Sequence, residues 1–238
     1  MDSYINWLSN NNYSKNTIRT YSSILKQYEN NMHDIRIVKR KILEHIDSPN
    51  TCILHYNVIV TYLNWMGDKR VSKIKSIKLP QVPYIYRDIF TKKFLYNKTM
   101  INDNDNYCLI KKKMTIRFLY ETGLRASELN SIKEIYEDYL VIIGKGNKER
   151  SVFYKKETFD LFYPYENSTK TLRIWVKEIL GNEFSPHSIR RSFATHMLMN
   201  GANPKMVQLQ LGHSKIETTF SYLNLSKNIN LKIYNKFF

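Results

Sequence analysis

A basic segment with two prolines interrupts a sequence that otherwise has mostly helical periodicity. The segment KRVSKIKSIKLPQVPYIYRD, residues 69–88, contains Pro80 and Pro83, which do not fit the interior of a helix. Its lysine-rich, proline-containing composition is typical of an exposed linker between domains. The sequence therefore predicts two domains, residues 1–78 and 87–238, joined by a linker at residues 79–86.

The first domain is expected to be helical. In the stretch YSKNTIRTYSSILKQYENNM, apolar residues recur on one helical face, and Ser14 precedes them as a candidate N-cap. In the next stretch, RIVKRKILEHI, one side carries basic residues and the other carries Ile35, Val38 and Ile42. This pattern predicts a basic amphipathic helix, although an ordinary solvated face has the same pattern.

The second domain combines helices with a β-hairpin. Residues 107–123, YCLIKKKMTIRFLYETG, predict a helix that ends at Gly123, and RASELNSI predicts a short second helix. In DYLVIIGKGNKERSVFY, two apolar runs flank a turn that contains Gly144 and Gly146 and places Lys145 at its tip. Helical periodicity returns from residue 168 onward. The predicted fold class is mainly α with a small antiparallel β-hairpin or sheet.

The charge of the chain indicates an anionic partner. Its 37 Lys and Arg residues against 21 Asp and Glu residues give a formal net charge of +16. An AT-rich coding sequence also enriches lysine, but we favour a nucleic acid partner. The sequence has no apolar run of about 18 residues and no pattern of a secretory signal, so we expect a cytoplasmic protein without a membrane segment.

The two cysteines point to no metal or redox chemistry. Cys52 and Cys108 lack the spacing of metal ligands or of a redox pair, and we expect both to be buried free thiols. No phosphate-binding loop of the NTPase type and no evident carboxylate cluster for a metal is present either. The sequence therefore predicts no cofactor and no metal.

Four short motifs follow one another in the second domain. They are TGLRASEL, IGKGNKERSV, PHSIRRSFATHML and LGHSKIETTFSYL. Their order and residue types resemble the tyrosine recombinase (phage integrase) family, most closely its Xer-like members. The resemblance covers nearly the whole chain but is sharp only from about residue 115 to residue 225. It implies a catalytic group of Arg125, Lys145, His187, Arg190, His213 and Tyr222.

These residue types fit covalent chemistry on a DNA phosphate. A tyrosine hydroxyl ordinarily ionises near pH 10, so Tyr222 needs help to attack the scissile phosphate. Arg125 and Arg190 can each donate forked hydrogen bonds to non-bridging oxygens, and His213 can donate to the same phosphate. His187 is placed to accept the tyrosine proton or to donate to the phosphate, and the sequence does not separate these roles.

The hairpin supplies candidates for the leaving-group proton. Lys145 is the predicted general acid that protonates the DNA 5′-oxygen, and Lys148 is a rival for this role. Lys148 and Arg150 are otherwise expected to contact the DNA backbone, as are Lys73 and Lys75 in the basic segment.

Each motif residue also has an ordinary structural interpretation. His187 follows Pro186 and is a candidate helix N-cap, His196 is expected to be structural, and Tyr222 fits an apolar helix face with its neighbours. In the family that the chain resembles, the position of Glu128 orients catalytic side chains, so we expect Glu128 to support the site. The motifs together favour the catalytic interpretation.

The resemblance implies a site-specific recombinase that needs neither ATP nor a metal ion. It would cut and rejoin DNA through a 3′-phosphotyrosyl intermediate and a Holliday junction. The two domains would form a C-shaped clamp on duplex DNA, and the C-terminal tail, residues 228–238, would join four copies into a ring. The alternatives are a type IB topoisomerase and a non-catalytic DNA-binding relative.

Overall fold

Two compact units make up the chain. The computed structural model describes residues 1–83, 89–144, 146–223 and 234–235. Its contacts divide the chain into unit 1, Met1–Ile85, and unit 2, Tyr86–Phe238. Lys145 and most of the tail at residues 228–238 lie outside the described residues. None of the described helices is long and apolar enough to cross a membrane.

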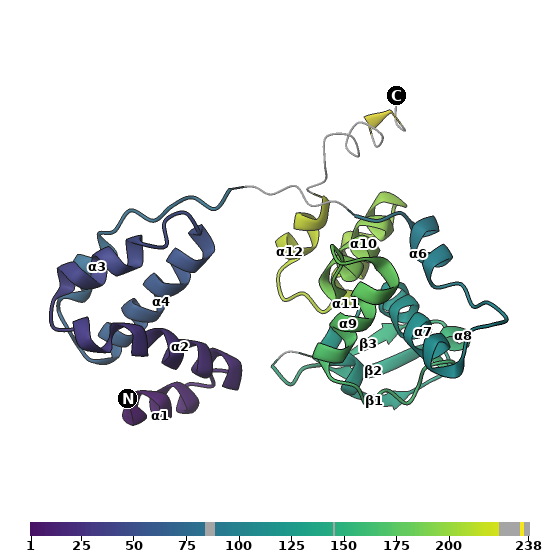
Figure 1. The fold of residues 1–238 in the computed structure, drawn as a ribbon, viewed down its shortest axis with the longest axis horizontal. Coiled ribbons are helices and arrows are strands. Elements are labelled where there is room, and N and C mark those ends of the chain that lie inside the picture. Colours follow the sequence, from purple (N-terminus) through teal and green to yellow (C-terminus); the bar gives the residue numbers. More distant parts are fainter. Residues whose placement is uncertain (84–88, 145, 224–233, 236–238) are drawn as a thin grey trace. The chain divides into compact units, whose positions relative to one another are not determined.

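Unit 1 is helical in its described part (Figure 1). Its α-helices are α1 (Asp2–Asn10), α2 (Lys15–Tyr28), α3 (Ile35–Leu43), α4 (Pro49–Trp65) and α5 (Val71–Lys75), with a 3₁₀ turn at Glu29–Asn31. The predicted cap is confirmed, because the Ser14 hydroxyl accepts a hydrogen bond from the Thr17 N–H at 3.2 Å. The apolar side of α3 is buried as predicted, through Ile35, Val38 and Ile42.

Unit 2 surrounds a buried central helix. Helix α7 (Tyr107–Thr122) packs against α8 (Lys156–Phe159), α9 (Thr169–Leu180) and α10 (Pro186–Met199). The other described helices are α6 (Lys92–Lys98), α11 (Pro204–Leu211), α12 (Ile216–Phe220) and the 3₁₀ helices η2 (Ala126–Asn130) and η3 (Ser221–Leu223). Gly123 ends α7 with φ of 67°, as predicted, and a Cβ there would overlap the Phe193 ring.

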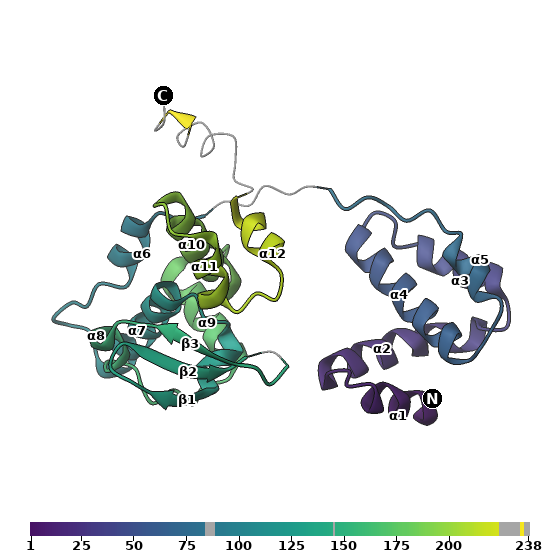
Figure 2. The ribbon, with the colours of Figure 1, turned by 180° about the vertical axis from the view of Figure 1, so that it is seen from behind.

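A three-stranded antiparallel sheet completes unit 2 (Figure 2). Its strands lie in the order β1 (Ile132–Ile135), β2 (Tyr139–Ile143) and β3 (Glu149–Phe153). The predicted hairpin is β2–β3, with Tyr139 opposite Phe153 and Ile143 opposite Glu149. Strand β1 was not predicted. The fold class, mainly α with a small antiparallel sheet, is confirmed.

One local prediction is wrong, and one structural alternative is excluded. Cys52 is buried, but Cys108 lies in the first turn of α7 and is exposed, because this turn projects beyond the core that covers the rest of the helix. His187 does not cap α10. Ser185 is the N-cap, with its hydroxyl accepting from the Ser188 N–H at 3.3 Å, and Pro186 takes the first helical position.

Candidate active site

A buried carboxylate binds two arginines beside the end of α11. The Glu128 side chain in η2 is only 3% exposed. Its Oε1 accepts hydrogen bonds from Arg125 Nη1 at 2.6 Å and Arg150 Nη1 at 2.9 Å, and its Oε2 accepts from Arg150 Nη2 at 2.8 Å. Arg190 Nη1 lies 3.9 Å from the same Oε2. Glu128 therefore holds several guanidinium groups in place, an arrangement compatible with the supporting role expected of it.

The arginines keep this carboxylate ionised. Burial alone would raise the pKa of Glu128, but hydrogen bonds and charge from Arg150 and Arg125 lower it overall. The charged form is therefore the stable one at neutral pH.

Main-chain carbonyls hold the two predicted catalytic arginines. Arg190 donates to the Gly123 carbonyl and to the Leu211 carbonyl, both at 2.6 Å. Arg125 donates to the Leu211 carbonyl at 3.5 Å and to the Gly212 carbonyl at 3.2 Å. Both guanidinium groups therefore meet at the C-terminal end of α11, although they are 65 positions apart in sequence.

Arg190 is the more deeply buried of the two. Its side chain is 3% exposed, against 33% for Arg125. Burial and the charge of Arg125 lower the pKa of Arg190 to about 10, while Tyr222 and Glu128 act in the opposite direction. Arg190 thus remains a cation at neutral pH, close to the tyrosine that the sequence singled out.

Tyr222 lies beside both predicted histidines. It sits in η3 with 8% exposure, and its ring centroid is 5.6 Å from that of His213 and 6.5 Å from that of His187. Its backbone carbonyl accepts a hydrogen bond from the Thr195 hydroxyl of α10 at 3.0 Å. Tyr222 also belongs to the hydrophobic core of unit 2, so its ring packs against apolar side chains as well as lying near the two histidines.

His213 follows the left-handed turn that ends α11 at Gly212, where φ is 65°. Its Nδ1 is 2.9 Å from the hydroxyl of Thr219. Burial, reinforced by the charges of Arg190, Arg125 and Arg150, lowers the pKa of His213 to about 4. The imidazole is therefore neutral at pH 7.

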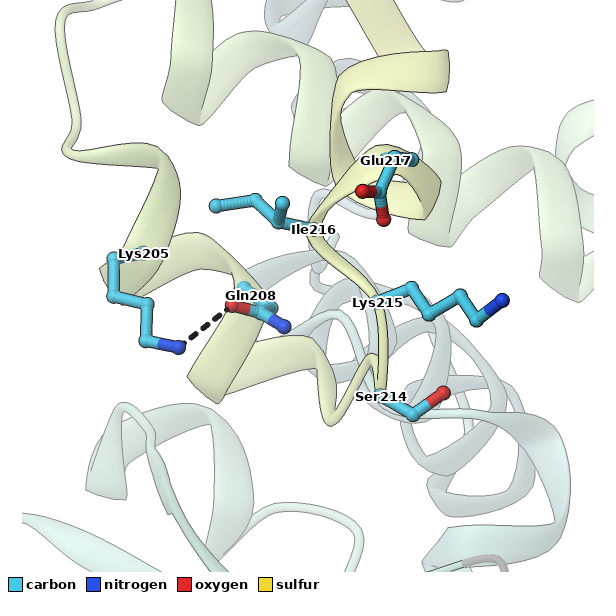
Figure 3. Close-up of a pocket in the computed structure, with 6 residues that line it drawn as sticks. All are labelled: Lys205, Gln208, Ser214, Lys215, Ile216 and Glu217. Carbon is cyan, nitrogen blue, oxygen red and sulfur yellow. Dashed lines mark hydrogen bonds between the residues drawn. The ribbon is translucent and has the colours of Figure 1, made fainter.

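Gln208 holds the backbone of His213 and was not found from the sequence. Its side-chain amide donates to the His213 carbonyl at 2.9 Å, and its side-chain oxygen accepts from Lys205 Nζ at 3.1 Å. Figure 3 shows Lys205 and Gln208 facing each other on α11, beside the segment that leads from Ser214 to α12. No periodicity or motif marks such a contact, because a glutamine on a helix is ordinarily a solvated residue.

Two cavities border the arginines. One, of about 580 Å³, is lined by residues that include Arg125, Lys148 and His213. The other, of about 320 Å³, also borders Arg125 and is lined by residues that include His187 and Arg173. Arg173 in α9 was not among the predicted residues. A phosphate group that enters either cavity meets the Arg125 guanidinium.

The structure brings most of the predicted site together. Arg125, Glu128, His187, Arg190, His213 and Tyr222 lie in one region of unit 2, and Lys148 lines the larger cavity. The guanidinium of Arg150, which the sequence predicts as a contact to the DNA backbone, binds Glu128 in this structure and donates to the Gln210 carbonyl at 3.2 Å. Lys73 and Lys75 are exposed at the end of α5 in unit 1.

Comparison with known proteins agrees with this geometry. The sequence model of the phage integrase family matches residues 165–228. The tyrosine recombinase XerC of Bacillus licheniformis is 27% identical over 94% of this chain and 90% of that protein. The tyrosine recombinase XerD of Staphylococcus saprophyticus is 34% identical over 53% of this chain and 54% of that protein.

A solved structure shares the fold. The λ integrase tetramer bound to a Holliday junction superposes with a TM-score of 0.71 at 15% identity, covering 93% of this chain and 75% of that one. The family segment at residues 165–228 contains His187, Arg190, His213 and Tyr222. Residues 165–228 therefore match the phage integrase family, and the chain as a whole is similar to Xer tyrosine recombinases.

Proposed function

We propose that the chain is a site-specific DNA recombinase that uses Tyr222 as its nucleophile. The observation that carries this proposal is the convergence of Arg125, Arg190 and His213 around this tyrosine. The Tyr222 oxygen attacks the scissile phosphorus and forms a 3′-phosphotyrosyl bond, while the bond from phosphorus to the DNA 5′-oxygen breaks.

The two arginines and His213 stabilise the charge that develops during this attack. Arg125 and Arg190 donate to the non-bridging oxygens, and the neutral His213 ring donates to the same group. The two arginines are held before DNA binds by Glu128 and by main-chain carbonyls, so little reorganisation of these donors is needed in the transition state. Removal of one such donor typically slows a reaction by about 10²-fold to 10³-fold.

A lysine of the hairpin protonates the leaving 5′-oxygen. We propose Lys145 for this role, with Lys148 as the alternative because it lines the larger cavity. The tyrosine proton needs an acceptor, and His187 serves either as this acceptor or as a further donor to the phosphate. A His187→Gln variant separates the two roles, since glutamine donates a hydrogen bond but does not take up a proton.

The covalent intermediate explains why the reaction would need neither ATP nor a metal ion. The phosphotyrosyl bond conserves the free energy of the broken phosphodiester, and the cationic side chains supply the charge neutralisation that a metal ion provides in other nucleases. The 5′-hydroxyl of a partner strand then attacks the phosphotyrosine and releases Tyr222, and a second round of exchange resolves the Holliday junction.

Duplex DNA and further copies of the chain are the proposed partners. Unit 1 and the basic segment that contains Lys73 and Lys75 would complete a clamp on DNA, in agreement with the net charge of +16. The λ integrase structure is a tetramer on a Holliday junction. We propose the same assembly here, with residues 228–238 docked on the neighbouring copy. Sedimentation of DNA complexes of a protein truncated after Ser226 tests the tail, since retained tetramers would contradict it.

Trapping of a covalent adduct tests the central claim. The substrate is a duplex that carries the recombination site and a nick close to the scissile phosphate. Cleavage releases the short fragment that bears the new 5′-hydroxyl, so the adduct cannot be religated. The native chain should form an adduct, and Tyr222→Phe should bind the same duplex without forming one. An adduct on Tyr222→Phe would mean that another tyrosine attacks. Relaxation of plasmids that lack the site would indicate a topoisomerase instead, and absence of any adduct would indicate a non-catalytic DNA-binding protein.

A further inference from the structure

The contact between His213 and Thr219 carries chemical information beyond its role in packing. Thr219 is fully buried in α12, three residues before Tyr222, and its hydroxyl oxygen is 2.9 Å from His213 Nδ1. Two other buried threonines of unit 2, Thr115 and Thr122, bond within their own helix, α7. Thr115, for example, donates to the Lys111 carbonyl at 2.8 Å. The Thr219 hydroxyl instead lies against the imidazole.

This contact allows two proton arrangements. In the first, the Thr219 hydroxyl donates to Nδ1 and the imidazole proton resides on Nε2. In the second, Nδ1 carries the proton and donates to the threonine oxygen, which leaves Nε2 as an acceptor. A phosphodiester oxygen only accepts hydrogen bonds, so His213 can serve it in the first arrangement and not in the second.

The cationic surroundings of His213 keep its imidazole ring singly protonated, so the position of that one proton decides which ring nitrogen can donate. The groups that face His213 are Arg190 and His187 from α10, Arg125 before η2, and Arg150 on β3. Together with burial they hold the pKa of His213 at about 4, so the free protein has one imidazole proton to place at neutral pH. A doubly protonated ring would donate from both nitrogens, but these charges oppose it.

We propose that Thr219 is a positioning residue that fixes His213 in the form protonated on Nε2, and thereby keeps the imidazole a donor to the scissile phosphate. The assignment rests on the proposed recombinase function for its consequence, although the tautomer itself does not depend on that function. The short spacing to Tyr222 adds a second effect, because the same hydrogen bond ties the segment that carries the nucleophile to the phosphate-binding histidine.

Imidazole nitrogen chemical shifts test the tautomer directly. Protein with ¹⁵N-labelled histidine is compared at neutral pH with the His213→Gln variant, which identifies the His213 signals. The native chain should show protonated Nε2 and unprotonated Nδ1, and Thr219→Val should shift the population toward the form protonated on Nδ1. A native His213 that carries its proton on Nδ1 would overturn the proposal.

Cleavage rates test the consequence. Thr219→Val keeps the shape of the side chain and removes its hydroxyl. It should slow single-turnover adduct formation by about 10-fold to 100-fold, by analogy with residues that orient metal-binding histidines. Thr219→Ser should restore most of the rate. Thr115→Val, which removes a buried hydroxyl of the same kind from α7, should leave the rate unchanged and controls for lost stability.

Two results separate this proposal from the function on which it rests. If the native chain forms no adduct, the recombinase assignment fails while the nitrogen spectra still decide the tautomer. If the native chain forms an adduct and Thr219→Val forms it equally fast, the positioning role is wrong. A rate that falls in Thr219→Val but is not restored by Thr219→Ser would also contradict it, since the effect would then come from packing.

Discussion

Replacing Glu128 by glutamine removes the negative charge that Arg125 and Arg150 share while keeping the shape of the side chain. Glu128 is 3% exposed and accepts three hydrogen bonds of 2.6–2.9 Å from the guanidinium groups of these arginines. Removing one partner of a buried ion pair typically costs about 3–5 kcal/mol. Two guanidinium groups lose their partner here, so we expect the free energy of unfolding to fall by about 5 kcal/mol, at the upper end of that range.

Hydrogen exchange measured by mass spectrometry gives this loss region by region. Since 1.4 kcal/mol corresponds to tenfold, a loss of about 3–5 kcal/mol lowers the protection of slowly exchanging amides by roughly 10²-fold to 10³·⁵-fold. The effect should appear in α7 and α10 and be absent from α2 and α4, because unit 1 has its own core. Arg150→Met should lower the free energy of unfolding less than Glu128→Gln does, since Arg125 continues to bind the carboxylate.

The matched control is Glu178→Gln. Glu178 also pairs with a cation, Lys112, at 2.8 Å, but its side chain is 47% exposed. Exposed pairs of this kind contribute about 0.2–1 kcal/mol. If Glu128→Gln lowers protection in unit 2 no more than Glu178→Gln does, then the buried carboxylate does not organise the arginines as the distances suggest.

Three further predictions concern the chemistry and DNA binding. The Lys145→Ala variant should cleave DNA poorly. A substrate with a 5′-bridging phosphorothiolate should restore its cleavage, because the sulfur leaves without protonation. If this substrate rescues only Lys148→Ala, then Lys148 is the general acid. Replacing Lys73 and Lys75 by glutamine should weaken binding to specific and random duplexes alike. The slope of log affinity against log salt concentration should become shallower by about 2. A loss of affinity for the specific site alone would mean that these lysines contact bases. The folded pKa of His213, about 4, lies below its ordinary value, so the unfolded state binds the proton more readily. Urea unfolding of unit 2 should therefore become easier as pH falls from about 6.5 toward 4, and His213→Gln should flatten this dependence.

Local signals were sufficient for the elements whose boundaries depend on adjacent residues. Ser14 and Gly123 were predicted as caps because their chemistry acts within one helical turn. The hairpin followed from two apolar runs around a glycine turn. Strand β1 was missed because its polar Lys133 and Glu134 obscure the alternation and its pairing with β2 is irregular at this point.

The sequence identified residue types better than their partners. The basic side chain of Arg150 was recognised, but its carboxylate partner, Glu128, was not, because Glu128 lies 22 positions away in sequence. Gln208 and Thr219 were overlooked for a similar reason, since their contacts with His213 depend on the turn at Gly212. Such contacts form only when the chain has folded.

The carbonyl groups that anchor the arginines also place two helix dipoles at the site. Gly123 ends α7, while Leu211 and Gly212 end α11, so the negative poles of two helices point at Arg190 and Arg125. Each pole is equivalent to roughly half a negative charge. With the full charge of Glu128, they offset about two of the three positive charges of Arg125, Arg150 and Arg190. The remainder, roughly one positive charge, matches the single negative charge of a phosphodiester. The helix dipoles and Glu128 thus reduce the repulsion among the three arginines and leave enough positive charge to attract a phosphate.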